Sequence, residues 1–329
     1  MTVELLNVGT VGEYLISRGL LKSSAGVVIE ELSGGVSNIV LGVSDGEMDV
    51  VLKQALPELK VATRWLADQR RAIVEARAVE LYNSISPMNV PRLIDSDPEM
   101  FTLVINRAPR SSRVWKTELL SGIVEPEIGF TLGQILRSWH ALGRTEEVRE
   151  SFLEAELFEQ LRVNPFYRVV SEKNHSLSHR IKDLIYDLEN DRSTIVHGDF
   201  SPKNILVDGD QAVYILDFEV AHWGNPTFDL AFLIAHLLCK YHQSSSEETC
   251  QKIINLASGF LDGYKDGHPD HISELLGWHT ALIALARVEG QSPVNYLDLE
   301  NQQRLQFSTK LALSSDIPTQ VLDLFAKRF

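Results

Sequence analysis

The stretch from Thr194 to Ala231 constrains this chain most, because Asp199, Asn204, Asp217 and Asp229 lie at meaningful intervals among its short apolar runs. Residues 195–196, 205–207 and 212–216 are typical of short strands, and Asp208-Gly209-Asp210 predicts a turn between the last two. The polar residues therefore fall at strand ends and turns, where catalytic side chains are usually found.

Asp199, Asn204 and Asp217 have the spacing of a metal and phosphate site. Asp199 and Asn204 lie five residues apart across a loop that contains Pro202, and Asp217 ends the next strand. If that strand completes a hairpin, all three side chains come to one edge. A phosphoryl-transfer site uses an Asp as base, with an Asn and a second Asp on Mg²⁺, which prefers oxygen ligands. We therefore predict Asp199 as the catalytic base and Asn204 and Asp217 as metal ligands.

Taken singly, these fragments have simpler interpretations. A lone His-x-Asp is also a metal-ligand pair of hydrolases, and a lone Asp-x4-Asn occurs in Asx-rich loops. In this chain the motifs occur together and in order, and the set resembles the aminoglycoside phosphotransferase and choline kinase group: His197-Gly198-Asp199, Asn204, Asp217, Gly224-Asn225-Pro226 and Asp229.

The resemblance implies an α+β, bilobal protein-kinase-like fold. A small N-terminal lobe with an antiparallel sheet would precede a larger, mostly helical C-terminal lobe. The cofactors implied are ATP and Mg²⁺, and the reaction implied is transfer of the γ-phosphate to a hydroxyl group of a small molecule. His197 and Asp229 would support the loop that carries Asp199.

Three strands are predicted near the N-terminus, over 27–32, 39–43 and 50–54. A glycine-containing turn joins the first two, and a lysine lies on the third. Kinases cover nucleotide phosphates with such a turn and neutralise charge with such a lysine, although a plain turn and a solvated lysine are the simpler alternatives. The residues predicted to contact the nucleotide here are Gly34, Gly35, Ser37, Asn38 and Lys53.

A helix is predicted over residues 71–82, since apolar residues recur there with helical spacing. Kinases pair a glutamate of such a helix with the strand lysine. Glu75 is the predicted partner of Lys53, with Glu80 as the competitor. An exposed helical carboxylate is the alternative for either residue.

Residues 51–57, followed by Trp65 and Arg70-Arg71, are similar to 5-methylthioribose kinases, a branch of the same superfamily. The chain departs from that branch at Ser201-Pro202-Lys203, which puts a sugar substrate in doubt. The basic run over 60–71 is interpreted either as a solvated helix face or as a lid over substrate or phosphate.

A boundary is predicted at residues 106–109, after two more strands over 90–95 and 101–105. We therefore expect a nucleotide-binding lobe over 1–105 and a catalytic and substrate-binding lobe over 106–329. In the family, the backbone of this link binds adenine, which assigns that role to Asn106 and Ala108.

The second half is predicted to be helical, with helices over 128–142, 152–161, 230–238 and 275–288. His140, on the first of these, is predicted to be a packed, hydrogen-bonded histidine. The stretch from Leu161 to Arg168 carries no evident chemistry. A short helix is also expected within residues 5–20, ending near Gly19.

The charge and cysteine content exclude some classes of protein. The chain has 329 residues, of which 44% are hydrophobic, and a formal net charge of −14, which argues against a nucleic-acid partner. An acidic chain weakly favours a cationic substrate. Cys239 and Cys250 form no disulfide framework or CxxC motif, and no apolar run is long enough to span a membrane. A cytoplasmic protein is expected.

The resulting prediction is an ATP-dependent small-molecule kinase that acts on a hydroxyl group. A 5-methylthioribose-kinase-like sugar kinase and a noncatalytic nucleotide-binding protein on the same fold are the alternatives. Phe218-Glu219 follows Asp217 where protein kinases have Phe-Gly, which argues against protein substrates. Glu219 is expected to contact a metal, a cationic substrate or a nearby arginine. Nothing in the sequence indicates the oligomeric state.

Overall fold

The computed structural model describes residues 3–32, 35–60, 65–209, 212–266 and 272–326. The chain divides into two compact units. The first contains Met1–Ser111 and Leu216–Val220, and the second contains Ser112–Ile215 and Ala221–Phe329. Among the described residues, no helix combines the length and the apolar character that crossing a bilayer requires.

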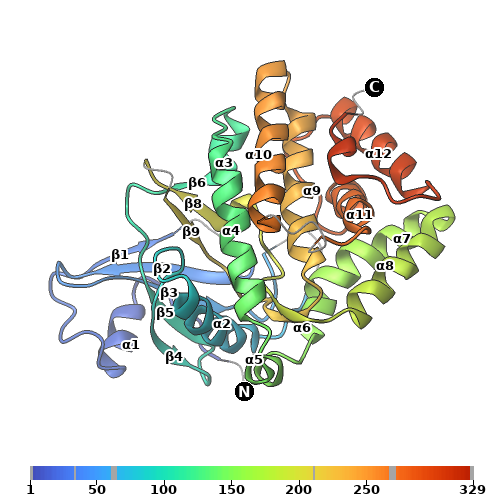
Figure 1. The fold of residues 1–329 in the computed structure, drawn as a ribbon. Helices are drawn as coiled ribbons and strands as arrows, with labels where there is room; N and C mark the ends of the chain where they lie inside the picture. Colours follow the sequence, from blue (N-terminus) through green and yellow to red (C-terminus); the bar gives the residue numbers. More distant parts are fainter. Residues whose placement is uncertain (1–2, 33–34, 61–64, 210–211, 267–271, 327–329) are drawn as a thin grey trace. The chain divides into compact units, whose positions relative to one another are not determined.

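The first unit is built on a five-stranded antiparallel sheet with the order β1-β2-β3-β5-β4 (Figure 1). The tight turn between β2 and β3 contains Gly46 at φ +91°, a conformation that glycine adopts without steric cost. The five strands are β1 (Val28–Glu31), β2 (Asn38–Ser44), β3 (Asp49–Ala55), β4 (Leu93–Asp97) and β5 (Thr102–Asn106).

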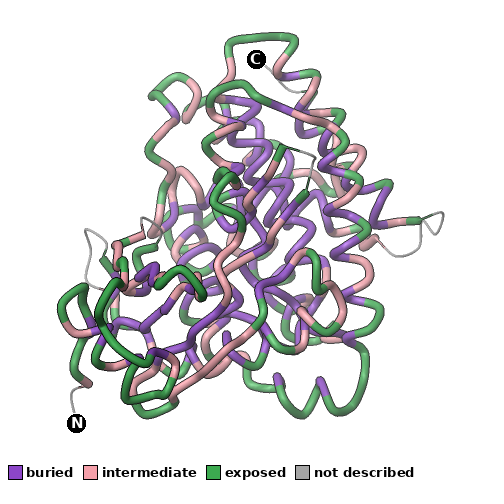
Figure 2. Tube along the Cα trace, turned by 90° about the vertical axis from the view of Figure 1, so that its left-hand side faces the viewer, coloured by how far each residue is buried: buried purple, intermediate pink, exposed green. Residues whose placement is uncertain are grey.

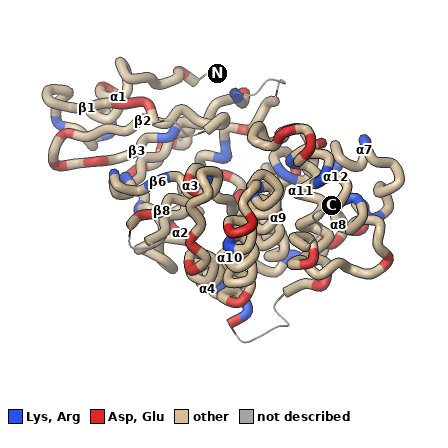
Figure 3. Tube along the Cα trace, turned by 90° about the horizontal axis from the view of Figure 1, so that it is seen from above, with Lys and Arg blue, Asp and Glu red and all other residues tan. Residues whose placement is uncertain are grey.

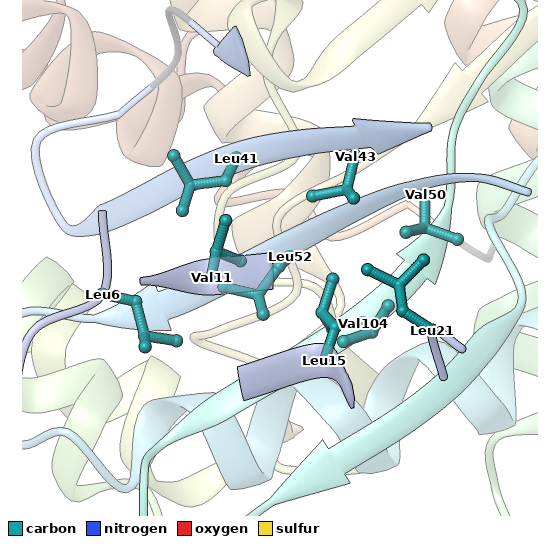
Figure 4. Close-up of a cluster of buried hydrophobic side chains, with 9 residues drawn as sticks. All are labelled: Leu6, Val11, Leu15, Leu21, Leu41, Val43, Val50, Leu52 and Val104. Atoms are coloured by element: carbon teal, nitrogen blue, oxygen red, sulfur yellow. The ribbon is translucent and has the colours of Figure 1, made fainter. Parts of the chain in front are cut away.

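Two helices accompany this sheet, α1 (Val11–Ser17) and α2 (Arg71–Ile85). Buried residues of α1 and its flanking segments pack with alternate residues of β2 and β3 into one apolar cluster (Figure 4). Its members are Leu6, Val11, Leu15, Leu21, Leu41, Val43, Val50, Leu52 and Val104. The period-two pattern of the strands thus supplies one apolar face, and α1 covers it.

The second unit carries two small antiparallel sheets that hold one loop. One sheet pairs β7 (Thr194–Val196) with β10 (His222–Gly224). The other has the order β6-β8-β9, formed by β6 (Arg113–Val114), β8 (Ile205–Val207) and β9 (Val213–Ile215). The predicted hairpin of β8 and β9 is confirmed, and the loop over 197–204 runs from β7 to β8.

Helices make up most of the second unit (Figure 1). α4 packs along α10, and α9 packs along α11. α9 is buried over almost its whole length, and buried residues are purple in Figure 2. The α-helices are α3 (Trp115–Leu120), α4 (Glu127–Leu142), α5 (Glu146–Ser151), α6 (Glu156–Phe158), α7 (Val169–Lys173), α8 (Ser178–Asn190), α9 (Thr227–Gln243), α10 (Glu247–Lys265), α11 (Leu276–Glu289) and α12 (Leu299–Leu313).

Short helices of other types complete this unit: the π-helix η1 (Glu159–Arg168) and the 3₁₀ helices η2 (His175–Leu177), η3 (Pro202–Asn204) and η5 (Val321–Leu324). The prediction of an amphipathic α-helix over 152–161 was wrong. Only three residues, in α6, are α-helical there before the chain enters η1. Pro165 lies inside η1, and because proline has no N–H to donate, it disfavours a regular α-helix.

Candidate active site

Lys53 lies at the centre of the first unit's polar cluster. Its side chain is 10% exposed, and its Nζ lies 2.5 Å from Oε1 of Glu75 and 2.8 Å from Oδ1 of Asp217. β3 supplies the lysine and α2 the glutamate, and Asp217 follows β9 in the chain. The expected pairing of Lys53 with Glu75 is present.

Three carboxylates surround this lysine. Oxygens of Glu75, Asp217 and Glu219 lie within 4.8 Å of one another. Burial alone would lower the pKa of Lys53, but the attraction of Asp217, Glu75 and Glu219 raises it above its ordinary value. Burial raises the pKa of Glu75 to about 7, against the opposing attraction of Lys53. Such a group of carboxylates suits a hard divalent cation.

Glu219 holds the turn before β2 and the start of α2. Its Oε2 accepts hydrogen bonds from Nε of Arg71, at 3.2 Å, and from Nδ2 of Asn38, at 3.1 Å. Arg71 is fully buried and also donates to the carbonyl oxygens of Ser37, Leu56, Ala67 and Asp68. Of the partners that the sequence left open for Glu219, the nearby arginine is the one present.

Asp217 has a left-handed backbone conformation, with φ +71°. This conformation is uncommon for a residue other than glycine, and it persists only where the surroundings impose it. The ion pair with Lys53 is one such constraint. The backbone strain at Asp217 is typical of a functional position.

The other residues predicted to bind nucleotide also lie in the first unit, except that Gly34 falls outside the described residues. Gly35 is exposed, whereas Ser37 and Asn38 are buried. The side chain of Asn106 is engaged locally, since its Oδ1 accepts from the N–H of Arg92. Among the described residues, the N–H and C=O of Ala108 form no hydrogen bond.

Asp199 lies in the second unit and is 2% exposed. Its Oδ2 lies 2.9 Å from Nη2 of Arg162 and 2.8 Å from Nζ of Lys203. Arg162 comes from η1 and also donates from Nε to the carbonyl oxygen of Gly198. Sequence reasoning missed Arg162; the single available signal was a charged residue within an otherwise apolar stretch that contains a proline.

The loop before Asp199 is anchored by buried hydrogen bonds. The two carboxylate oxygens of Asp229 accept from the N–H groups of His197 and Gly198, at 2.7 and 2.9 Å. Gly198 has φ +76°, which glycine tolerates. His140 bonds Asp229 through Nε2 and the hydroxyl of Tyr264 through Nδ1. His140 is therefore the packed, hydrogen-bonded histidine that was predicted.

Asp229 stays ionised in this setting. Burial raises its pKa, but the hydrogen bond and charge of His140 and the N–H of His197 outweigh burial and hold the pKa of Asp229 below its usual range. A buried carboxylate that accepts several N–H bonds favours its charged form. Asp229 thus fixes the backbone that carries Asp199.

Asn204 is buried close to Asp199. Its Nδ2 donates to the backbone oxygen of Asp199 at 3.0 Å, and in the part of the chain that the structure describes its Oδ1 has no hydrogen-bond partner. An amide oxygen is among the ligand types that hard divalent cations bind. Asp199 and Asn204 belong to the second unit and Asp217 to the first.

Two surface cavities of about 330 and 390 Å³ lie in the second unit. Phe158, Leu188 and His222 are among the residues that line the first. Leu261, Gly277 and Leu322 are among those that line the second. Neither cavity is lined by Asp199 or by its partners. The loop over 197–204 therefore indicates the position of the candidate active site better than these cavities do.

Residues 28–274 match the model of the phosphotransferase enzyme family. Among curated proteins, a methylthioribose kinase of Bacillus cereus is 25% identical over 258 residues, and one of Bacillus mycoides is 24% identical over 255. The first alignment covers 70% of this chain and 65% of the relative. The chain thus spans about two thirds of the length of the curated relatives that it matches.

Solved structures share the fold. Amicoumacin kinase hAmiN, in complex with AMP-PNP, Ca²⁺ and Ami, has a TM-score of 0.58 at 14% identity, covering 95% of this chain and 96% of the other. A choline/ethanolamine kinase family protein from Mesorhizobium loti has a TM-score of 0.55 at 14% identity, covering 97% and 98%. The predicted protein-kinase-like α+β fold is confirmed, as is the resemblance to these kinases.

Proposed function

The chain belongs to the phosphotransferase enzyme family, and from that premise we propose that it transfers the γ-phosphate of ATP to a hydroxyl group of a small molecule. The observation that carries this proposal is the buried carboxylate of Asp199, in a loop that Asp229 holds through two backbone N–H groups. A carboxylate fixed in this way is suited to accept the proton of an attacking hydroxyl.

The first unit is the proposed nucleotide-binding lobe, and the second is the proposed catalytic lobe that binds the acceptor substrate. Lys53, oriented by Glu75, would neutralise phosphate charge, and the segment from Gly34 to Asn38 would approach the phosphates. The backbone of Asn106 and Ala108 would bind adenine. AMP-PNP in the amicoumacin kinase complex supports the choice of an adenine nucleotide.

Asp217 and Asn204 are the proposed ligands of a divalent cation, Mg²⁺ in the ATP complex. Each donor taken by itself suits a hard cation: Asp217 offers a carboxylate beside those of Glu75 and Glu219, and Asn204 offers an amide oxygen with no hydrogen-bond partner among the described residues. When bound, the cation supplies charge neutralisation at the phosphates. Ca²⁺ in the amicoumacin kinase complex agrees with a divalent ion.

A sugar kinase is the second candidate, because curated relatives are methylthioribose kinases. A noncatalytic nucleotide-binding protein is a third interpretation, which the filled catalytic positions disfavour. These possibilities differ in what the protein turns over, so one assay separates them.

The test is a coupled ADP-release screen of the purified chain with Mg-ATP against hydroxylated amines, sugars and hydroxy acids, with Asp199→Asn beside it. We expect one class to stimulate release, and we expect the variant to lose about 10³-fold or more in rate. If 5-methylthioribose is the one compound that stimulates ADP release, the result favours the sugar kinase. If no compound is phosphorylated while Mg-ATP still binds, the noncatalytic alternative holds.

A further inference from the structure

Five cations from five elements of the second unit lie near one another, and two of them contact Asp199. We call them the cation cluster: Lys116 (α3), Arg162 (η1), Lys203 (η3), Lys240 (α9) and Arg287 (α11). α9 packs against α11, η1 packs against α11, and α3 packs against both η3 and α9. Figure 3 marks basic residues in blue and labels α3, α9 and α11. This concentration of positive charge contrasts with the chain as a whole, which carries a formal net charge of −14.

Asp199 pairs with two members of the cluster and leaves three unmatched. Arg162 and Lys203 bind its Oδ2. Among the described residues, Lys116, Lys240 and Arg287 form no ion pair with a carboxylate. Asp199 attracts Arg287 without forming an ion pair with it, and burial still lowers the pKa of that arginine. Three cations close together with no carboxylate in contact are costly, since burial and mutual repulsion both disfavour their charged forms.

Lys240 shows that cost most clearly. The residue is 1% exposed, and its Nζ donates to the backbone oxygen of His236 at 3.2 Å. Burial, followed by the repulsion of Lys116 and Arg287, lowers the pKa of Lys240 to about 7. A buried lysine that gains no carboxylate partner is rare in a core and points to a ligand.

Arg287 is the second unmatched cation. Its Nε is shielded from solvent and has no hydrogen-bond partner in the described part of the chain. Its guanidinium carbon lies 5.5 Å from the centre of the Phe166 ring. Burial lowers the pKa of Arg287, yet an arginine stays charged in proteins. An inward donor without an acceptor is expected where a ligand supplies the acceptor.

Tyr296 joins these cations together. Nζ of Lys240 lies 5.3 Å and Nζ of Lys116 lies 5.7 Å from the centre of its ring. Its Oη is buried without a hydrogen-bond partner among the described residues, and burial raises its pKa, so the hydroxyl keeps its proton. Tyr296 therefore adds a hydroxyl donor beside the side-chain amines of Lys116 and Lys240 and the guanidinium of Arg287.

Neighbouring titratable groups do not neutralise the cluster. Burial and the charges of Arg287, Lys240, Lys203 and Lys116 lower the pKa of His236 well below its ordinary value, so this imidazole is neutral. Burial raises the pKa of the Cys239 thiol to about 11, so it carries no negative charge at pH 7. The side chain of Lys203 is 49% exposed, so the cluster reaches solvent on its side.

We propose that Lys116, Lys240, Arg287 and Tyr296 bind an anionic group of the acceptor, so that the acceptor is a hydroxylated carboxylate or phosphate ester. This inference rests on the proposed function and names its substrate class. It reverses the weak expectation of a cationic substrate that the net charge suggested, since a cationic group would be repelled by the cluster. A guanidinium with an ammonium beside it is a common receptor for such anions.

The first test compares matched acceptors that differ in one terminal group. Straight-chain ω-hydroxy acids, their amides, their amino-alcohol counterparts and the corresponding hydroxyalkyl phosphates are assayed with Mg-ATP at several chain lengths. We expect the carboxylate or the phosphate series to be phosphorylated with a kcat/KM roughly 10- to 100-fold above the amides. Preference for the amino alcohols or the amides would overturn the proposal.

The second test uses variants of the cluster. Arg287→Met and Lys240→Met should raise KM for the anionic acceptor roughly 10-fold or more and leave KM for ATP unchanged. Arg287→Lys keeps the charge and should retain part of the affinity. Lys252→Met is the matched control, because this lysine is 44% exposed on α10 and pairs with Glu248. A rise in KM for ATP alone would assign the cluster to the nucleotide and refute the proposal.

A thermal-shift measurement separates this inference from the proposed function. Inorganic phosphate is compared with chloride at equal ionic strength for the wild type, the two methionine variants and Lys252→Met. We expect phosphate to raise the Tm of the wild type and of the control by more than that of either variant. That result without turnover of any acceptor would count against the kinase and uphold the anion site. Equal shifts in all four proteins would eliminate the site.

Discussion

At the scale of single residues, the structure separates charges that are matched from charges that are not. Lys53 has three carboxylates around it, and Arg71 has a carboxylate and four carbonyl oxygens. Lys240 has a single backbone oxygen. Arg71 and Lys240 are both buried, but the consequences for stability differ. The partners of Arg71 compensate for the loss of water around its charge, whereas a charged Lys240 has no such compensation and destabilises the fold.

Lys240→Met should stabilise the free protein, and by an amount that depends on pH. The pKa of Lys240 is about 7 in the folded protein and about 10.4 when unfolded, so between these values the unfolded chain binds more protons. The stability of the wild type should then rise with pH over this window. The advantage of the variant should be largest at pH 6–7 and shrink towards pH 9. Urea unfolding at four pH values checks this, and a pH-independent difference would contradict the pKa assignment.

Arg71→Met should destabilise the first unit by about 3–5 kcal/mol, because it removes the buried positive charge that pairs with Glu219 and one donor to each of several carbonyl oxygens. Arg70→Met is the matched control. Its side chain is 59% exposed and pairs locally with Asp68, so we expect a change within about 1 kcal/mol. Urea denaturation of the two variants measures the difference, and similar losses in both would show that burial of Arg71 is unimportant.

The residues also differ in how far sequence could assign them. Glu75 was predicted as the partner of Lys53, with Glu80 as the competitor, and helical spacing alone did not decide between them. The structure pairs Lys53 with Glu75 and leaves Glu80 exposed. Arg162 could not be assigned, because its position depends on a π-helix that local propensity does not specify. The separation of Arg71 from Glu219 by 148 positions likewise leaves no local signal.

At the scale of elements, helix packing in the second unit depends on glycines at close approaches. A Cβ at Gly133 of α4 would overlap the backbone carbonyl oxygen of Phe260 on α10. Gly259 of α10 has ordinary contact distance instead, with its nearest neighbour, the N of Phe130, at 3.5 Å. The sequence predicted α4 by its apolar period, but the period does not reveal which glycine faces the neighbouring helix.

Gly133→Ala should therefore destabilise the second unit by about 1–3 kcal/mol through forced separation of α4 and α10. Gly259→Ala, in the same helix pair, should be neutral or stabilise by up to about 1 kcal/mol, since alanine favours helix. Thermal unfolding compares the two. Equal Tm values for both variants would mean that the α4–α10 contact adjusts without cost.

At the scale of the whole molecule, the chain divides its chemistry between two units. Lys53, Glu75 and Asp217 belong to the first, and Asp199 and Asn204 belong to the second. The five strands of the first unit and the helices α2, α4, α9 and α11 were predicted, because period-two and helical patterns report local burial, whereas α8, α10 and α12 were not predicted. The segment Leu216–Val220 joins the first unit although the chain on both sides of it belongs to the second, and a local pattern cannot carry that information.

Net charge is a second property of the whole chain, and it does not indicate the charge at a particular site. A value of −14 suggests attraction of cations, yet the cation cluster presents three basic groups without carboxylate partners among the described residues. The fold brings these lysines and arginines together from positions 116 to 287. Their convergence depends on tertiary packing, so it cannot be predicted from the amino-acid composition.

The most direct test of this account is a paired measurement of Mg-ATP affinity and single-turnover phosphoryl transfer in the wild type, Asp199→Asn and Asp217→Asn. The account predicts that Asp199→Asn binds Mg-ATP within about threefold of the wild type while transfer falls by about 10³-fold or more. Asp217→Asn should lose Mg²⁺-dependent affinity itself. Transfer at the wild-type rate by Asp199→Asn, or unchanged Mg-ATP binding by Asp217→Asn, would contradict the proposed division of roles.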